Sequence, residues 1–392
     1  MSEAALHKNE SHWGALIAAA AATVVVGFAS TILVVIEGIK AMGADAAQQA
    51  SAAAILCYGM AVVSGVLSWR YKMPMIVAWS TPGSVLLATY HGAVTFPQAI
   101  GAFMFAAVLM IITGLIKPVA VAIANMPGSI AAAMLAGVLL HYALGVPVAA
   151  LDMPGFVLPL IIAFFALRAI VPMYTVPIIV ALGLVFAFLS GGMSQPIPVG
   201  VTPLTFDVPQ FNTEVLFGIG IPLFFVTMAS QNLPGFAVLR AHGYEPPVQP
   251  ALLMTGLASL VCAPFGSHAL NMAAITAALA AGKEAHPDPQ QRWKVIIPYF
   301  LMYIVFGLAA GTFVAMLGSL PKPLIAAVAG LALFAPLSGG MTAMMKEPKD
   351  IEPALVTFLV AASGISLFGV GAAFWGLVAG LALWGVKRVL QK

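Results

Sequence analysis

Residues 74–90 read PMIVAWSTPGSVLLATY, and residues 264–281 read PFGSHALNMAAITAALAA. Both stretches are apolar, short and interrupted by proline. In the first, Ile76–Ser80 is β-prone, and Thr81-Pro82 offers an N-cap followed by proline at the first helical position. In the second, Phe265–Ala269 precedes Asn271, a good N-cap residue, and then a strong helix former. Each stretch therefore predicts a short strand that leads into a half-helix.

The rest of the chain has the composition of a membrane protein. Of its 392 residues, 62% are hydrophobic and only 7% are charged, against roughly a quarter charged in soluble domains. The net charge of +3 is scattered, which argues against a nucleic-acid partner. Both cysteines, Cys57 and Cys262, lie in apolar runs, so we expect no disulfide framework and no metal cluster. Hydrolase, nucleotide and metal-ligand motifs are missing, so we expect neither an enzyme nor a cofactor.

Runs of about 20 apolar residues predict the membrane-spanning helices, and the tail of residues 1–12 precedes the first. The long runs are 13–36, 48–68, 98–117, 128–145, 155–170, 172–190, 212–238, 249–263, 295–318, 323–341, 353–367 and 370–388. With the two interrupted stretches they make fourteen crossings, seven in each half. The prediction is thus an all-α polytopic protein whose third and tenth segments are interrupted.

Basic residues set the orientation, because cytoplasmic ends of spans are rich in lysine and arginine. With both termini cytoplasmic, 14 of the 16 basic residues lie on the inner side, and only Lys40 and Lys322 lie outside. Omitting either interrupted stretch as a crossing would destroy this asymmetry. The expected location is therefore a bacterial inner membrane, crossed many times, with both termini inside.

The two halves resemble each other at an offset of about 193–200 residues. MPGSIAAAMLAG (126–137) matches LPKPLIAAVAG (320–330) with one gap, and Pro97-Gln98 matches Pro289-Gln290. Because seven is odd, the second copy is inverted relative to the first. Inverted repeats are typical of secondary transporters, whose binding site lies near mid-membrane where interrupted helices meet. The Pro-rich stretch 191–211 joins the copies.

Two helix N-termini that approach one point present free N–H groups and positive partial charge, which suits a carboxylate. The alternative is that both prolines are kinks that serve packing alone. Polar residues near these stretches form the candidate site, because polar groups at membrane depth are costly. Ser230 and Ser267 also suit interhelical hydrogen bonding, whereas Gln231, Asn232 and His268 favour function. Phe28 and Trp79 suit either packing or stacking on an aromatic substrate.

Three motifs carry a family resemblance: MASQNLPG (228–235), APFGSHALNMAAITAA (263–278) and LPKPLIAAVAGLALF (320–334). They resemble the benzoate:proton symporter (BenE) family, which is similar in fold to uracil and anion transporters with seven-plus-seven inverted repeats. The resemblance implies a substrate-binding core domain that moves against a gate domain like an elevator. It places the core at 13–118 and 212–318, the gate at 119–192 and 319–390, and a periplasmic linker at 193–211.

The resemblance also implies a substrate. Nucleobase transporters of this fold carry carboxylates where this chain has Gln231 and His268, and an amide with an imidazole suits an anion better. Ser267 departs from the glycine expected there. The expected function is import of benzoate or a related aromatic carboxylate with a proton, and His268, with an ordinary pKa near 6.5, is the proposed proton site. The expected substrate-binding residues are Phe28, Ser30, Trp79, Ser80, Thr81, Ser230, Gln231, Asn232, Ser267, His268, Ala269 and Asn271.

Other functions remain open at this point. Within transport, a nucleobase:proton symporter or an anion exchanger fits the same fold. From other classes, a passive channel or a non-transporting membrane scaffold would share the composition. The expected partners are the substrate, the proton and the lipid bilayer, and a homodimer is one assembly to test.

Overall fold

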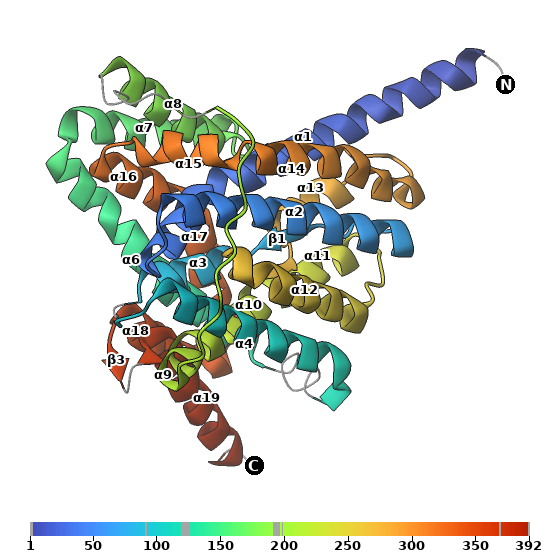
Figure 1. The fold of residues 1–392 in the computed structure, drawn as a ribbon. Coiled ribbons are helices and arrows are strands. Elements are labelled where there is room, and N and C mark those ends of the chain that lie inside the picture. The colour runs from blue at the N-terminus through green and yellow to red at the C-terminus, as the bar shows by residue number, and fades with distance from the viewer. Residues whose placement is uncertain are drawn as a thin grey trace.

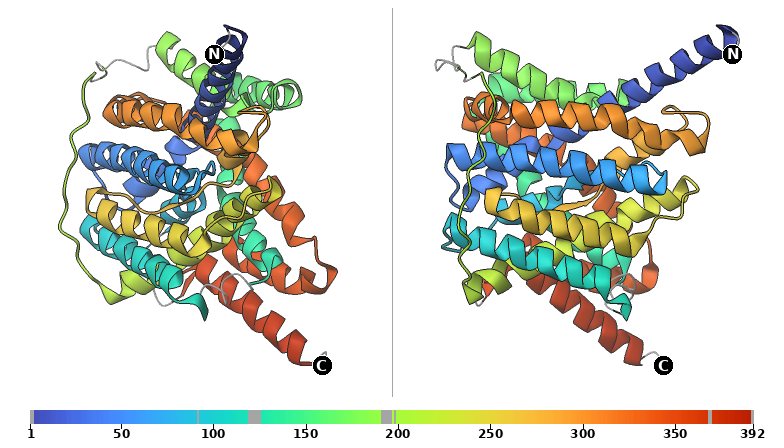
Figure 2. Two further views of the ribbon diagram at one scale, coloured as in Figure 1. Left: turned by 90° about the vertical axis from the view of Figure 1, so that its right-hand side faces the viewer. Right: turned by 45° about the vertical axis from the view of Figure 1, so that its right-hand side comes forward.

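The computed structural model describes residues 3–90, 92–118, 126–190, 197, 199–367 and 370–390. The chain is almost entirely helical (Figure 1). Both termini lie at one end of the bundle, and residues 199–211 run along the opposite end (Figure 2, right). The predicted gate start at 119 and the linker start at 193 lie outside the described residues.

In the first half, helices follow the predicted apolar runs. Their bounds are α1 (Glu3–Ala41), α2 (Ala46–Tyr71), β1 (Val77–Trp79), α3 (Thr81–Ala88), α4 (Phe96–Leu115), α6 (Gly128–Asp152), α7 (Pro154–Ile170) and α8 (Thr175–Leu189). Helix α1 begins at Glu3 and so includes most of the segment predicted as the N-terminal tail, residues 1–12. Asp45 starts α2 with a capping box, in which its carboxylate accepts from the Gln48 N–H.

The second half opens with one long helix, Thr213–Ala241, in which the hydrogen-bond ladder changes twice. It comprises α9 (Thr213–Val215), the π-helix η1 (Leu216–Gly220), α10 (Ile221–Thr227), the π-helix η2 (Met228–Asn232) and α11 (Leu233–Ala241). A proline follows each π-helix, Pro222 and Pro234, and proline has no N–H to donate to the carbonyl four residues earlier. The ladder therefore widens just before each proline.

The remaining elements complete the chain. They are α12 (Val248–Cys262), η3 (Ala263–Phe265), β2 (Leu270–Met272), α13 (Ile275–Ala281), η4 (Pro289–Val295), α14 (Ile296–Leu308), α15 (Ala310–Gly318), α16 (Lys322–Ala332), α17 (Phe334–Met344), η5 (Pro348–Asp350), α18 (Ile351–Ala362), β3 (Ser366–Leu367), β4 (Val370–Gly371) and α19 (Ala372–Leu390).

By length and composition, seven helices in the described ranges are able to cross a membrane, and nine if each bent pair counts as one span. The bent pairs are α14 with α15, which includes η4, and α16 with α17. Two shorter apolar helices, α7 and α8, accompany them. The chain is thus a multi-pass membrane protein, whereas the fourteen crossings and the inverted repeat stay predictions.

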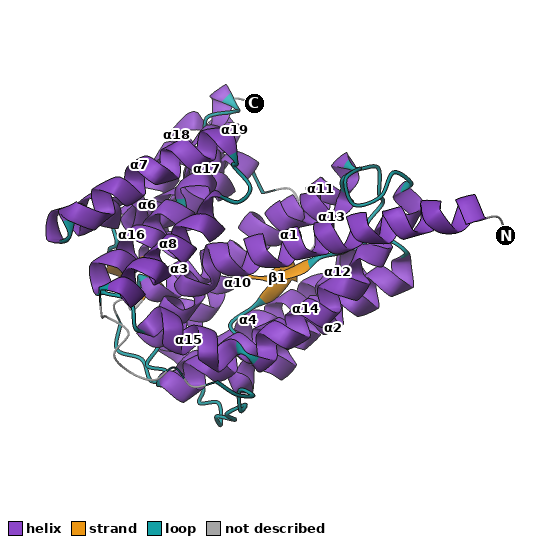
Figure 3. Cartoon of the chain, turned by 90° about the horizontal axis from the view of Figure 1, so that it is seen from above, coloured by secondary structure: helices purple, strands orange, loops and turns teal. Residues whose placement is uncertain are grey.

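The helices pack in two groups. In the first, α4 packs on α12, α2 packs on α14 and α15, and α1 packs on α3, α13 and α14. In this group β1 also packs on α2, and β2 packs on α2, α12 and η2. In the second, α6 packs on α7, α16, α17 and α18, α18 packs on α19, and α8 packs on α7 and α16. Seen along the vertical axis, β1 lies inside the first group (Figure 3). We call these the α1 group and the α6 group.

The two interrupted stretches meet at the centre of the α1 group. β1 pairs antiparallel with β2, with Val77 opposite Met272 and Trp79 opposite Leu270. Two flanking backbone bonds lengthen the contact, from the Ser80 N–H to the Ala269 carbonyl (3.2 Å) and from the Ala273 N–H to the Ile76 carbonyl (2.9 Å). A half-helix follows each strand, as expected.

Both predicted N-caps are wrong, the first by one residue and the second by three. Ser80, not Thr81, caps α3, because its extended backbone lets its hydroxyl accept from the Gly83 N–H at 3.1 Å. Asn271 does not cap α13. It lies in the middle of β2, and the half-helix begins at Ile275, with Ala274 at the cap position and no side-chain cap. Pairing with β1 therefore overrides the local capping preference of Asn271.

Candidate functional site

A cavity of about 400 Å³ lies where the half-helices begin and the two helix groups face each other. The polar part of the cavity lining comes from the α1 group, from residues of α1, β1, α3, η2, α13 and α14. The α6 group contributes an apolar wall from the start of α8 and the α16–α17 bend. The lining includes Ser30, Thr31, Trp79, Thr81, Gln231, Ala273, Ala274, Thr276 and Tyr303 opposite Pro172, Met173, Val176, Ala332, Ala335 and Pro336.

The lining combines aromatic surface with uncharged polar groups. None of the described lining residues carries a formal charge. The Trp79 indole donates to the Thr31 hydroxyl at 2.7 Å, and that hydroxyl donates to the Gly27 carbonyl at 3.0 Å. The indole plane is thereby fixed. An apolar pocket with a few convergent polar groups is the usual form of a small-molecule site.

Gln231 reaches the cavity from η2. A π-helix at this point re-aims successive side chains, and such bulges are frequent at functional sites. Its neighbour Asn232 does not line the cavity and is fully buried. The Asn232 amide oxygen accepts from the Met272 N–H at 2.9 Å and so ties η2 to β2. Gln231 thus faces the cavity, whereas Asn232 is hydrogen-bonded to the backbone of β2.

His268 lies behind the cavity lining, in a buried network around Ser80. Its Nε2 is 3.0 Å from both the Ser80 carbonyl oxygen and the Ser84 hydroxyl oxygen, and that hydroxyl donates to the same carbonyl. Because a carbonyl only accepts, Nε2 carries the hydrogen. Nδ1 is then the unprotonated nitrogen, and it is buried with no partner among the described residues.

Thr227 extends this network to the long helix of the second half. Its hydroxyl donates to the Ser80 hydroxyl at 2.9 Å. Asn271, with its amide oriented to satisfy both ends, accepts from the Ser80 N–H at 3.0 Å and donates to the Met272 carbonyl at 3.1 Å. Ser80 is therefore the junction of α3, α10 and β2.

The other predicted residues also lie outside the cavity lining. Phe28 is buried and packs its ring on Phe306 and Phe313, at centroid distances of 4.7 and 5.0 Å. Its ring lies 5.8 Å from that of Trp79. The hydroxyls of Ser230 and Ser267 are buried without a hydrogen-bond partner in the described structure.

Of the twelve predicted residues, the cavity therefore brings together Ser30, Trp79, Thr81 and Gln231. The other eight lie in the β1–β2 junction or in the packing around it. Sequence reasoning missed Thr31, Thr276 and Tyr303, although each is a polar group within an apolar run and carried that signal. It also missed the α6-group wall, whose apolar residues carry no such signal. Among the described residues, no three His, Cys, Asp or Glu side chains lie close enough to share a metal ion.

Comparison with known families gives one match over nearly the whole chain. Residues 10–386 match the family described as "BenE: Benzoate membrane transport protein". The "Inner membrane protein YdcO" of Escherichia coli (strain K12) is 36% identical over 371 residues, which are 94% of each chain. The "Benzoate membrane transport protein" of Acinetobacter baylyi (strain ATCC 33305 / BD413 / ADP1) is 33% identical over 324 residues, 82% of each chain.

Solved structures share the fold at low identity. The transmembrane domain of the cyanobacterial bicarbonate transporter BicA has a TM-score of 0.62 at 14% identity, covering 94% of this chain and 97% of its own. The structure of SLC26A9 has a TM-score of 0.60 at 13% identity, covering 94% of this chain and 65% of its own. At these identities the likeness concerns the fold.

Proposed function

Because the chain belongs to the BenE family of benzoate membrane transport proteins, we propose that it imports benzoate, or a close aromatic monocarboxylate, together with a proton. The family consists of membrane transporters rather than enzymes. The observation that carries the proposal is the uncharged, aromatic-lined cavity at the start of the two half-helices. Its position between the two helix groups gives a substrate contacts to both.

The ring of the substrate packs against Trp79 and Tyr303, and burial of apolar surface stabilises it by about 25 cal/mol per Å². The carboxylate faces the Gln231 amide and the Thr81 hydroxyl, with Ser30 as a further donor. Hydrogen bonds to a charged group contribute about 1.5–3 kcal/mol each. The start of α13, which has no side-chain cap, adds partial positive charge on the same side.

His268 is the proposed proton site, with Nδ1 as the atom that takes the proton. The His268 ring is hydrogen-bonded to the carbonyl of Ser80, which is the N-cap residue of α3. Protonation of the ring therefore acts on the start of α3. A proton carried with the anion cancels its charge. Transport then avoids working against an inside-negative potential, which costs about 2.3 kcal/mol per charge at 100 mV.

Alternating access is proposed to follow the packing groups. We equate the α1 group with the predicted core at 13–118 and 212–318, and the α6 group with the predicted gate at 119–192 and 319–390. In the elevator mechanism the core carries the half-helices and the substrate past the gate. The proposed setting is a bacterial inner membrane with both termini in the cytoplasm.

Proteoliposomes test the proposal directly. Uptake of labelled benzoate is expected to rise with an inward-directed proton gradient and to collapse when an uncoupler is added. Protein-free liposomes give the background of passive benzoic acid entry. An excess of unlabelled benzoate should compete, whereas uracil and bicarbonate should not. Uptake that does not depend on the proton gradient would contradict proton coupling. Competition by uracil or bicarbonate, but not by benzoate, would show that the substrate is a nucleobase or an inorganic anion instead.

A further inference from the structure

A second cavity, of about 630 Å³, lies at the other end of α1 from the N-terminus. It is bordered by the C-terminal ends of α1 and α3 and by α6 and α16. Its titratable side chains are Glu37, Lys40, His141, Tyr142 and Lys322. We call it the lysine cavity.

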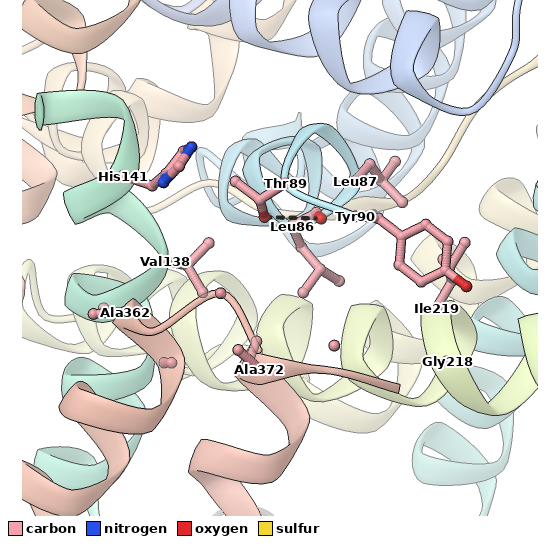
Figure 4. A pocket seen from close by; sticks show the side chains of 15 residues that line it. Leu86, Leu87, Thr89, Tyr90, Val138, His141, Gly218, Ile219, Ala362 and Ala372 are labelled. Carbon is pink, nitrogen blue, oxygen red and sulfur yellow. Dashed lines mark hydrogen bonds between the residues drawn. The ribbon is translucent and has the colours of Figure 1, made fainter. Parts of the chain in front are cut away.

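A smaller cavity of about 50 Å³ adjoins the lysine cavity, and the two share Thr89 and His141. Figure 4 shows His141 on α6 across from Thr89 at the end of α3. Both cavities are lined by residues at the C-terminal end of α3, from the α1 group, and by residues of α6, from the α6 group. The lysine cavity is thus a gap between the same two groups that enclose the proposed benzoate cavity.

The lysine cavity has an excess of positive charge. Lys40 and Lys322 are both exposed, and they face one carboxylate, that of Glu37. The Lys40 ammonium lies 3.5 Å from that carboxylate, with 57% of its side chain exposed. Lys322 makes no ion pair among the described residues. One cation therefore remains uncompensated in a cavity whose other lining residues, apart from Thr89, His141 and Tyr142, are alanine, glycine and isoleucine.

The sequence pattern makes this placement unusual. Of the 16 lysines and arginines, only Lys40 and Lys322 are expected on the face that carries the linker. They come from different helix groups, α1 and α16, yet they line one cavity. A cleft with one sign of charge and low-dielectric walls raises the local concentration of ions of opposite sign.

We propose that the lysine cavity is a capture site for organic monocarboxylate anions on the face that carries the linker. Lys40 and Lys322 hold the carboxylate before it reaches Gln231 and Thr81. Glu37 opposes this binding, because it neutralises Lys40. The identity of the captured anion rests on the proposed function, whereas the preference of the cavity for anions does not.

The transport test compares variants that remove positive charge from the lysine cavity with a variant that removes negative charge from it. The double variant Lys40→Gln/Lys322→Gln is expected to raise the KM for benzoate uptake at least three-fold at low ionic strength, with Vmax nearly unchanged. Glu37→Gln is expected to lower the KM, and Lys40→Arg/Lys322→Arg to keep the wild-type value. Added salt should shrink all differences, because the Debye length falls to about 3 Å at 1 M.

A second measurement needs no transport. Gly145 lines the cavity, and a Cβ atom there meets no atom within 4 Å, so Gly145→Cys is sterically permitted. Both native cysteines are buried. An anionic methanethiosulfonate should modify Gly145→Cys faster than a cationic one, and Lys40→Gln/Lys322→Gln should lower that ratio several-fold.

Three results would overturn the inference. The first is an unchanged KM in Lys40→Gln/Lys322→Gln, and the second is a KM that rises in Glu37→Gln as well. The third is an equal rate of modification of Gly145→Cys by the anionic and the cationic reagent. Failure of wild-type benzoate uptake would instead contradict the proposed function, and the reagent ratio would still decide the inference. Thermal unfolding of each variant in detergent identifies any variant that is misfolded.

Discussion

Gln231 and Asn232 are adjacent in sequence, yet the structure gives them different surroundings. Gln231 lines the cavity, whereas Asn232 is buried and accepts a hydrogen bond from the backbone of β2. The π-helix before Pro234 produces this split. The sequence presents both as polar residues in an apolar run, so it identifies the pair without assigning a role to either.

Substitution of each residue should therefore give a different phenotype. Gln231→Ala should weaken benzoate binding by roughly ten-fold or more, because a hydrogen bond to a carboxylate contributes about 1.5–3 kcal/mol. Its unfolding temperature should match that of the wild type. The checks are the KM of uptake and the thermal shift that saturating benzoate produces. Unchanged affinity would place the carboxylate elsewhere.

Asn232→Ala should instead destabilise the fold. It leaves the buried Met272 N–H without its acceptor, which costs about 1–3 kcal/mol. A lower apparent unfolding temperature in detergent, measured at one scan rate, is the expected outcome. Stability equal to that of Gln231→Ala would show that the bond between η2 and β2 contributes little.

His268 gives a third prediction at this scale. His268→Ala should abolish benzoate accumulation driven by a proton gradient while benzoate exchange continues, because exchange needs no net proton movement. Ser84→Ala serves as the control, since it removes one contact of Nε2 and leaves Nδ1 unchanged. Full accumulation by His268→Ala would move the proton site to another residue.

At the scale of elements, α1 and α3 depend on a close approach. A Cβ atom at Gly38 would lie 2.6 Å from the Ser84 carbonyl oxygen. Gly38→Ala should therefore push α3 away and destabilise the protein by about 1–3 kcal/mol. Gly14→Ala on the same helix meets no atom within 4 Å and should be neutral or slightly stabilising. Thermal unfolding of the two variants checks this, and equal stability would contradict the contact.

The interrupted stretches show what local sequence is able to predict. Proline and β-prone residues gave the strand and half-helix of residues 77–88 with an error of one residue at the cap. Local sequence predicts Asn271 as a cap and does not show that it pairs with Ala78, almost two hundred residues earlier in the chain. Capping preference is local, whereas strand pairing is not. The apolar residues that the α6 group contributes to the cavity are likewise absent from the predicted site, because they reach the cavity only through packing between the two groups.

At the scale of the whole molecule, orientation is the remaining prediction. Lys322 begins α16, and Lys349 follows α17, at the opposite end of that bent pair. In intact cells, a membrane-impermeant maleimide should label Lys322→Cys and leave Lys349→Cys unlabelled until the cells are opened. Both native cysteines are buried and give little background. Labelling of Lys349→Cys alone would reverse the assigned orientation.

The pairing of β1 with β2 also bears on biogenesis. A ribosome releases Val77–Trp79 long before Leu270–Met272 exist, and lipid offers no partner for an open strand edge. In the folded protein the Ser64 hydroxyl accepts from the Val77 N–H at 2.8 Å, so this N–H has a partner that is synthesised before β1. The junction of β1 and β2 beside the proposed substrate cavity is thus among the last parts to assemble during synthesis. Chains that terminate early should reach quality-control proteases with this edge still exposed.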